Sequence, residues 1–62
     1  MPEVDRYSFY TNDLKGRSPE DQLINMLVLV QSERSWEDYD KTVDKSIRGE
    51  CIMFTYKGEL HD

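Results

Sequence analysis

An apolar run at residues 23–30 constrains the fold of this chain more than any other feature. Asn25 is the only polar residue in the run, and Ser-Pro-Glu-Asp precedes it at residues 18–21. Serine caps helix N-termini, proline fits the first turn, and acidic residues favour the positive end of the helix dipole. Periodicity alone also allows a buried strand. The capped start and the length of the segment favour a helix over residues 18–33.

The apolar side of this expected helix is unusually wide. At about 100° per residue, the apolar side chains cover roughly 200° of the helix surface. They are Leu23, Ile24, Met26, Leu27, Val28 and Val30. Leu29 falls outside this arc, beside polar residues. Because one neighbouring element cannot cover so wide an arc, we expect the helix to need a further surface to pack against.

A second start signal lies at Ser35, where Ser-Trp-Glu-Asp places Asp38 in position to complete a capping box. The apolar residues that follow are spaced by three, four and four, which is typical of a narrow helical stripe: Trp36, Tyr39, Val43 and Ile47. A cation and then Gly49 end the segment, as they commonly end helices. We therefore predict a second helix over residues 35–48.

Strands are predicted at both ends of this helix pair. Residues 4–11 and 51–57 are rich in aromatic and β-branched side chains in loose alternation. The order β-α-α-β predicts a small α+β domain in which two antiparallel strands pack on a helix pair. We expect a single domain over residues 1–62, with residues 1–3 and 59–62 as frayed tails.

A chain of 62 residues buries little surface and usually needs a supplement to its core. Cys51 is the only cysteine, which excludes an internal disulfide and a cysteine-based metal site. We therefore expect a homodimer to complete the fold, in preference to a monomer or an obligate complex with a different protein. A lone thiol is typical of the reducing cytoplasm, where we expect the protein to act. No segment approaches the roughly 20 apolar residues of a membrane span.

The sequence predicts no catalysis, no cofactor and no metal. His61 is the only histidine, and we expect it to be a solvated tail residue. Cys51 is expected to be a small buried hydrophobe, because a nucleophilic thiol needs an electropositive and accessible setting. The glycines stand singly at predicted turns, without a phosphate-binding pattern.

The net charge of −5 opposes direct binding to nucleic acid. On the predicted second helix and its approach, carboxylates form a row along one side: Glu33, Glu37, Asp40 and Asp44. The alternative is an ordinary solvated face, because Lys41 and Arg48 stand four residues after two of these acids and can neutralise them. We predict that this row, together with Tyr10 and Leu29, binds a partner protein.

These features predict a small acidic protein-binding inhibitor or antagonist, of the kind that phages and mobile elements encode. In its most specific form it is a DNA mimic that blocks a nucleic-acid-handling enzyme or regulator. The alternative is a small accessory or regulatory subunit of a larger complex. A third hypothesis, a dimeric DNA-binding regulator, requires dimerisation to gather Arg6, Lys15, Arg17 and Lys57 into one basic patch.

Overall fold

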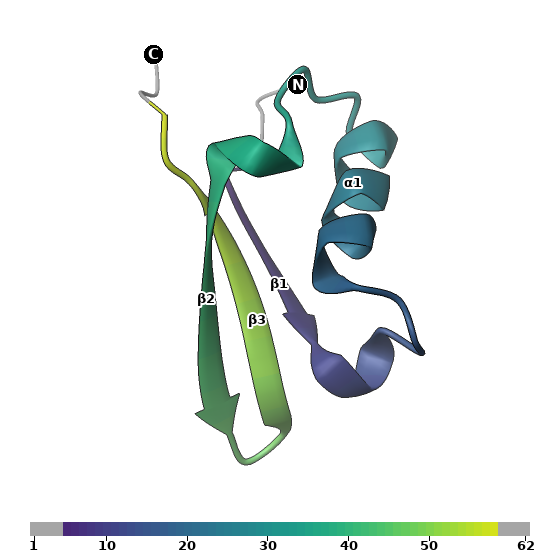
Figure 1. Ribbon diagram of the computed structural model, residues 1–62, viewed down its shortest axis with the longest axis vertical. Coiled ribbons are helices and arrows are strands. Elements are labelled where there is room, and N and C mark those ends of the chain that lie inside the picture. The colour runs from purple at the N-terminus through teal and green to yellow at the C-terminus, as the bar shows by residue number, and fades with distance from the viewer. Residues whose placement is uncertain (1–4, 59–62) are drawn as a thin grey trace.

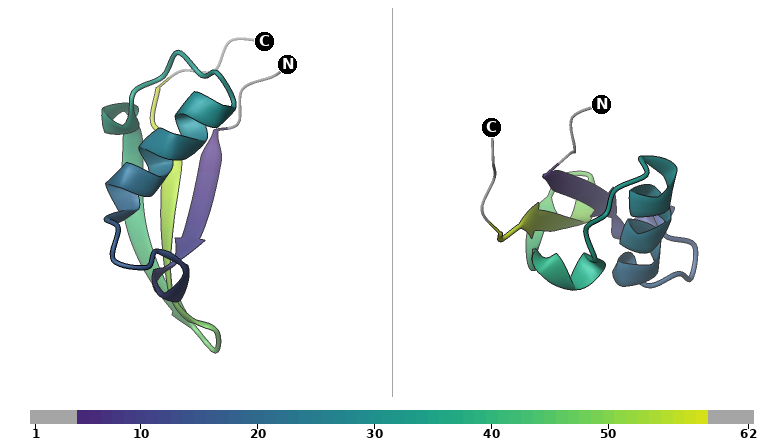
Figure 2. Two further views of the ribbon diagram at one scale, coloured as in Figure 1. Left: turned by 90° about the vertical axis from the view of Figure 1, so that its right-hand side faces the viewer. Right: turned by 90° about the horizontal axis from the view of Figure 1, so that it is seen from above.

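The computed structural model describes residues 5–58, so the expected tails and His61 lie outside the described residues. Three strands and one α-helix follow in the order β1 (Arg6–Tyr10), α1 (Pro19–Leu29), β2 (Tyr39–Ser46) and β3 (Gly49–Tyr56). Two short 3-10 turns, η1 (Thr11–Asp13) and η2 (Trp36–Asp38), precede α1 and β2. The strands form one antiparallel sheet in the order β1-β3-β2 (Figure 1). Helix α1 lies against one face of this sheet (Figure 2).

The predicted β-α-α-β fold is therefore wrong, because most of the expected second helix is strand β2. Side chains alternate along this strand, so the apolar Tyr39 and Val43 share a face and Asp40 and Asp44 share the other. A spacing of four residues fits one helical turn and also two strand repeats, so it does not separate the two structures. Only the spacing of three from Trp36 to Tyr39 is specifically helical, and Trp36 precedes the strand.

The capping signal at Ser35 and the glycine at position 49 both have structural roles, but they do not bound a helix. The capping box is present: Asp38 Oδ2 accepts a hydrogen bond from the Ser35 N–H at 3.0 Å, and Ser35 Oγ accepts one from the Glu37 N–H at 3.3 Å. It caps a single 3-10 turn. Gly49 takes a φ of 115° directly after the turn that joins β2 to β3. Glycine adopts this conformation without strain, so it serves a hairpin as well as a helix end.

Helix α1 begins as predicted and ends four residues before residue 33. Ser18 Oγ accepts a hydrogen bond from the Asp21 N–H at 3.1 Å. At the other end, Gln31 adopts a left-handed φ of 56°. The Ser32 N–H donates to the Leu27 carbonyl at 2.9 Å, and the Gln31 N–H donates to the Val28 carbonyl at 3.1 Å. This pair of bonds is the Schellman motif, which reverses the chain at this point.

We expect the Gln31→Gly substitution to stabilise the protein by about 0.5–1 kcal/mol, because glycine takes a positive φ without the steric cost that glutamine carries. The control is Gln31→Ala, which removes the side chain but keeps the Cβ atom and the backbone strain. Urea unfolding followed by circular dichroism measures both changes. Equal stabilisation by both substitutions would contradict the assignment of the gain to the backbone.

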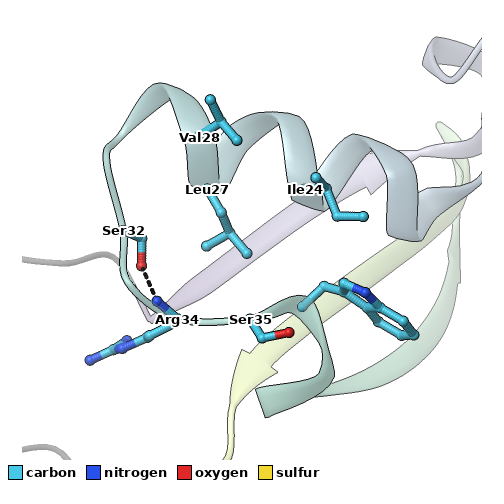
Figure 3. A pocket seen from close by; sticks show the side chains of 7 residues that line it. Ile24, Leu27, Val28, Ser32, Arg34 and Ser35 are labelled. Carbon is cyan, nitrogen blue, oxygen red and sulfur yellow. Dashed lines mark hydrogen bonds between the residues drawn. The ribbon is translucent and has the colours of Figure 1, made fainter.

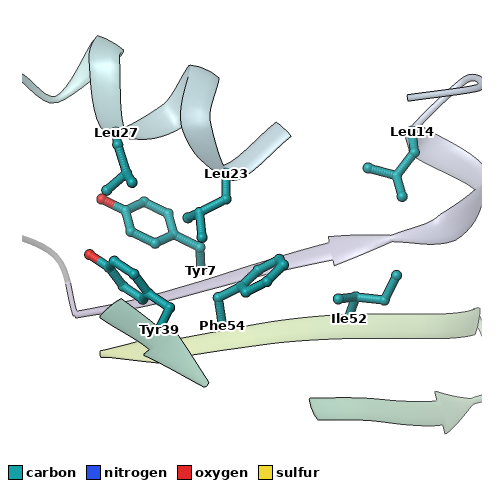
Figure 4. Close-up of a cluster of buried hydrophobic side chains, with 7 residues drawn as sticks. All are labelled: Tyr7, Leu14, Leu23, Leu27, Tyr39, Ile52 and Phe54. Carbon is teal, nitrogen blue, oxygen red and sulfur yellow. The ribbon is translucent and has the colours of Figure 1, made fainter. Parts of the chain in front are cut away.

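The core lies between α1 and the inner face of the sheet (Figure 4). Its buried residues are Tyr7, Leu14, Leu23, Leu27, Tyr39, Ile52 and Phe54. Of the apolar residues in α1, only Leu23 and Leu27 are fully buried. Tyr39 and Phe54 belong to this core, whereas Trp36, from the same predicted helical stripe as Tyr39, is 39% exposed. The sheet thus covers only part of the wide apolar arc of α1.

Candidate protein-binding surfaces

The six residues predicted to bind a partner lie on four different segments of the chain. The expected carboxylate row along a second helix does not exist, because Asp40 and Asp44 are on strand β2 and Glu33 and Glu37 are on the connection before it. Tyr10 ends β1, and Leu29 ends α1. Lys41, which would neutralise Glu37 on a helix, instead places its ammonium group 3.6 Å from a carboxylate oxygen of Glu20.

Strand register brings three of the six residues to one face of the sheet, opposite α1. Directly paired residues point to the same side, so each row of this face runs from β1 through β3 to β2. The rows are Arg6–Thr55–Asp40, Ser8–Met53–Thr42 and Tyr10–Cys51–Asp44. We call these nine residues the outer sheet face. None of its side chains is fully buried, and neither α1 nor η2 packs on it (Figure 2).

Cys51 lies on the central strand of this face, in the row between Tyr10 and Asp44, and is half-buried, which corrects the expectation of a buried thiol. Tyr10 is also half-buried, and the Arg48 guanidinium lies 5.9 Å from the centroid of its ring. Arg6 and Asp40 are exposed at opposite ends of one row. The outer sheet face therefore has a half-buried centre and polar edges.

A second surface is a groove of about 260 Å³ between α1 and the chain that returns alongside it to η2 (Figure 3). We call it the helix groove; it is lined by Ile24, Leu27, Val28, Ser32, Arg34, Ser35 and Trp36. Ile24 and Val28 lie one helical turn apart and are 39% and 70% exposed, and Trp36 from η2 is 39% exposed. The Schellman turn at Gln31 positions the groove, because it sends the chain back along the helix.

Three exposed acidic residues stand close to the lining residues in the chain, although none of them lines the helix groove itself. Asp21 stands seven residues before Val28 and thus on the same side of α1, while Glu33 and Glu37 each adjoin a lining residue. The Arg34 guanidinium lies 3.7 Å from the centroid of the Tyr56 ring, and its side chain points away from the groove (Figure 3). We call these three exposed carboxylates, which stand near lining residues in the chain, the negative rim of the groove.

Leu29 belongs to neither surface. It is 74% exposed, as its position outside the apolar arc predicts, and it is not among the residues that line the groove. The groove itself was missed from the sequence, although the width of the apolar arc indicated that part of α1 lacks cover. Trp36 lines the groove on the side opposite α1. It does so because β2 begins only at Tyr39, which leaves Trp36 in η2.

Two other features are absent from residues 5–58. No group of three histidine, cysteine, aspartate or glutamate side chains is arranged to hold a metal ion. No helix in the same part of the chain has the length and apolar character needed to cross a bilayer.

Comparison with known proteins found no matching family model, no matching curated protein and no matching solved structure.

Proposed function

We propose that this protein acts by binding another protein through the helix groove. The observation that carries the proposal is the exposure of apolar side chains around a formed groove, with Val28 70% exposed. Exposed apolar surface with a polar rim is typical of interaction sites. Because the rim is acidic, the partner that fits it presents an apolar side chain among basic residues.

Within this proposal, the protein is an inhibitor or antagonist whose target has a basic surface, as nucleic-acid-handling enzymes and regulators do. The DNA-mimic form depended on carboxylates in a helical row, and it loses that support because residues 39–46 are a strand. In the predicted helix Asp40 and Asp44 would stand on successive turns. On the strand, at roughly 3.3 Å per residue, they are about 13 Å apart. A cytoplasmic location belongs to the same proposal and is supported by the single cysteine.

The second candidate is an accessory subunit that docks the same groove onto a larger complex. It is favoured by the amount of apolar surface on α1 that the described fold leaves exposed, which includes Ile24 and Val28. An inhibitor reduces the activity of its partner when added to it, whereas an accessory subunit sustains or raises that activity. Assay of the purified partner with and without the protein therefore distinguishes the two.

The test of the groove is a Val28→Lys substitution, with Leu29→Lys as the matched control. Both side chains are well exposed on the same helix, at 70% and 74%, so neither change should disturb the fold. Quantitative affinity purification with tagged protein should recover one stoichiometric partner with wild type and with Leu29→Lys. Val28→Lys should weaken this binding at least about tenfold, because it places a charge against a desolvated apolar contact.

If Leu29→Lys lost the partner and Val28→Lys retained it, the interface would lie on the other side of α1. That result would overturn the groove assignment. A bound partner whose contact surface is acidic, or whose affinity does not fall as salt rises, would contradict the role of the negative rim.

A further inference from the structure

The outer sheet face is chemically asymmetric from one edge to the other. Its β1 edge carries the cation Arg6 and the phenol of Tyr10, whereas its β2 edge carries the carboxylates Asp40 and Asp44. Arg6 shares a row with Asp40, and Tyr10 shares a row with Asp44. Each of these two rows therefore has a hydrogen-bond donor at its β1 end and an anionic acceptor at its β2 end.

This asymmetry makes the face complementary to a second copy of itself. If two outer sheet faces meet across a two-fold axis parallel to β3, the β1 edge of each copy lies over the β2 edge of the other. Arg6 then faces Asp40 of the second copy, and Tyr10 faces Asp44 of the second copy. Symmetry repeats both pairs, so four donor–acceptor contacts form around the centre.

The other face-to-face arrangement is opposed by charge. A two-fold axis across the strands, passing over Met53, sets Asp40 of one copy against Asp44 of the other and leaves Arg6 facing Tyr10. Like charges placed opposite one another across an interface disfavour the pairing. The distribution of charge therefore selects the axis parallel to β3.

We propose that a second copy of this chain covers the outer sheet face, with the two sheets stacked about a two-fold axis parallel to β3. Met53 and Cys51 are half-buried in each copy and lie over their counterparts near the axis. An apolar centre with a charged rim is the usual anatomy of such an interface. This dimer differs from one in which the second copy covers α1, and it leaves the helix groove of each copy open.

The size of the face predicts a weak dimer. Strands about 4.8 Å apart and about 3.3 Å per residue give a contact footprint of only a few hundred Å² per copy. This is at the low end of specific interfaces, so the dissociation constant should be micromolar or weaker. Stacked sheets lie about 10 Å apart, a gap that the long side chain of Arg6 can reach across.

Charge reversal with mixing tests this arrangement by sedimentation equilibrium. Arg6→Asp and Asp40→Arg each place like charges in both symmetric contacts, so each variant alone should dimerise at least about tenfold more weakly than wild type. A one-to-one mixture of the two variants should form heterodimers with near wild-type affinity, because every altered side chain then meets an opposite charge. Both residues are exposed, and circular dichroism checks that the variants remain folded.

Cys51 supplies an independent measurement because it is the only cysteine. In the proposed dimer the two thiols point into the same gap and lie close to the axis, so a short bis-maleimide should link two wild-type chains. It should link the one-to-one mixture equally well and either variant alone much less. In the alternative arrangement, with the two-fold axis across the strands, Cys51 faces Thr55 of the other copy, and the cross-link between the two thiols is not favoured.

Several results would overturn the proposal. Wild-type protein that remains monomeric at about 1 mM would exclude any useful affinity. Stronger association of Asp40→Arg would indicate the axis across the strands. A dimer unaffected by either reversal, but disrupted by Val28→Lys, would place the second copy on the helix groove instead.

Discussion

Replacing Phe54 with alanine should leave little folded protein at room temperature. The Phe54 side chain is 1% exposed, lies between α1 and the sheet, and contacts Phe9 with ring centroids 6.2 Å apart. Truncation of a buried phenylalanine costs about 3–5 kcal/mol through lost burial and the cavity that remains. A domain of this length has a free energy of unfolding of only about 3–9 kcal/mol, at roughly 0.05–0.15 kcal/mol per residue.

The conservative control is Phe54→Leu, which keeps most of the apolar volume and should cost less than about 1.5 kcal/mol. Urea unfolding at one fixed protein concentration measures both variants, since dimerisation makes apparent stability depend on concentration. A Phe54→Ala protein that is as stable as Phe54→Leu would show that this side chain is not at the centre of the core.

A second large effect is expected on helix α1, where two leucines differ sharply in burial. Leu23 is fully buried against the sheet, at 0% exposure, and Leu29 is 74% exposed. Leu23→Ala should cost about 2–5 kcal/mol, whereas Leu29→Ala should change stability by less than about 0.5 kcal/mol. The chemical change and the helix are the same in both variants, so helix propensity cancels in the comparison.

Thermal and urea unfolding of the two alanine variants measure this difference. Similar losses in both would mean that α1 packs on the sheet with a different face, or that a second molecule covers Leu29. In the latter case, the loss at Leu29 should grow with protein concentration, which distinguishes the two explanations.

Helix α1 and the first and last strands could be predicted because their signals are local. Ser18 caps the helix it was expected to cap, and Tyr7 and Phe9 share one face of β1. Residues 35–48 could not be assigned correctly from the same kind of signal. The Tyr39–Val43 spacing fits a helix and a strand, and the turn before Gly49 resembles a helix end.

The composition of the candidate surfaces depends on pairing between distant parts of the chain. Arg6 and Asp40 share a row only because both flank Thr55 of β3. Sequence periodicity contains no information about that register, so Asp40, Asp44 and Tyr10 were predicted individually and Arg6 was not included with them. Glu33 and Glu37 border a different surface, the helix groove, whose wall at Trp36 follows from where β2 starts.

The central structural claim is that residues 39–46 pair with β3 as a strand and leave the outer sheet face open. Nuclear Overhauser effects between backbone protons test it most directly. We predict long-range contacts between β2 and β3 in the observed register, such as Thr42 with Met53 and Lys41 with Phe54. A series of contacts between residues three apart along 39–46, with no contacts to β3, would show a helix there and contradict the account.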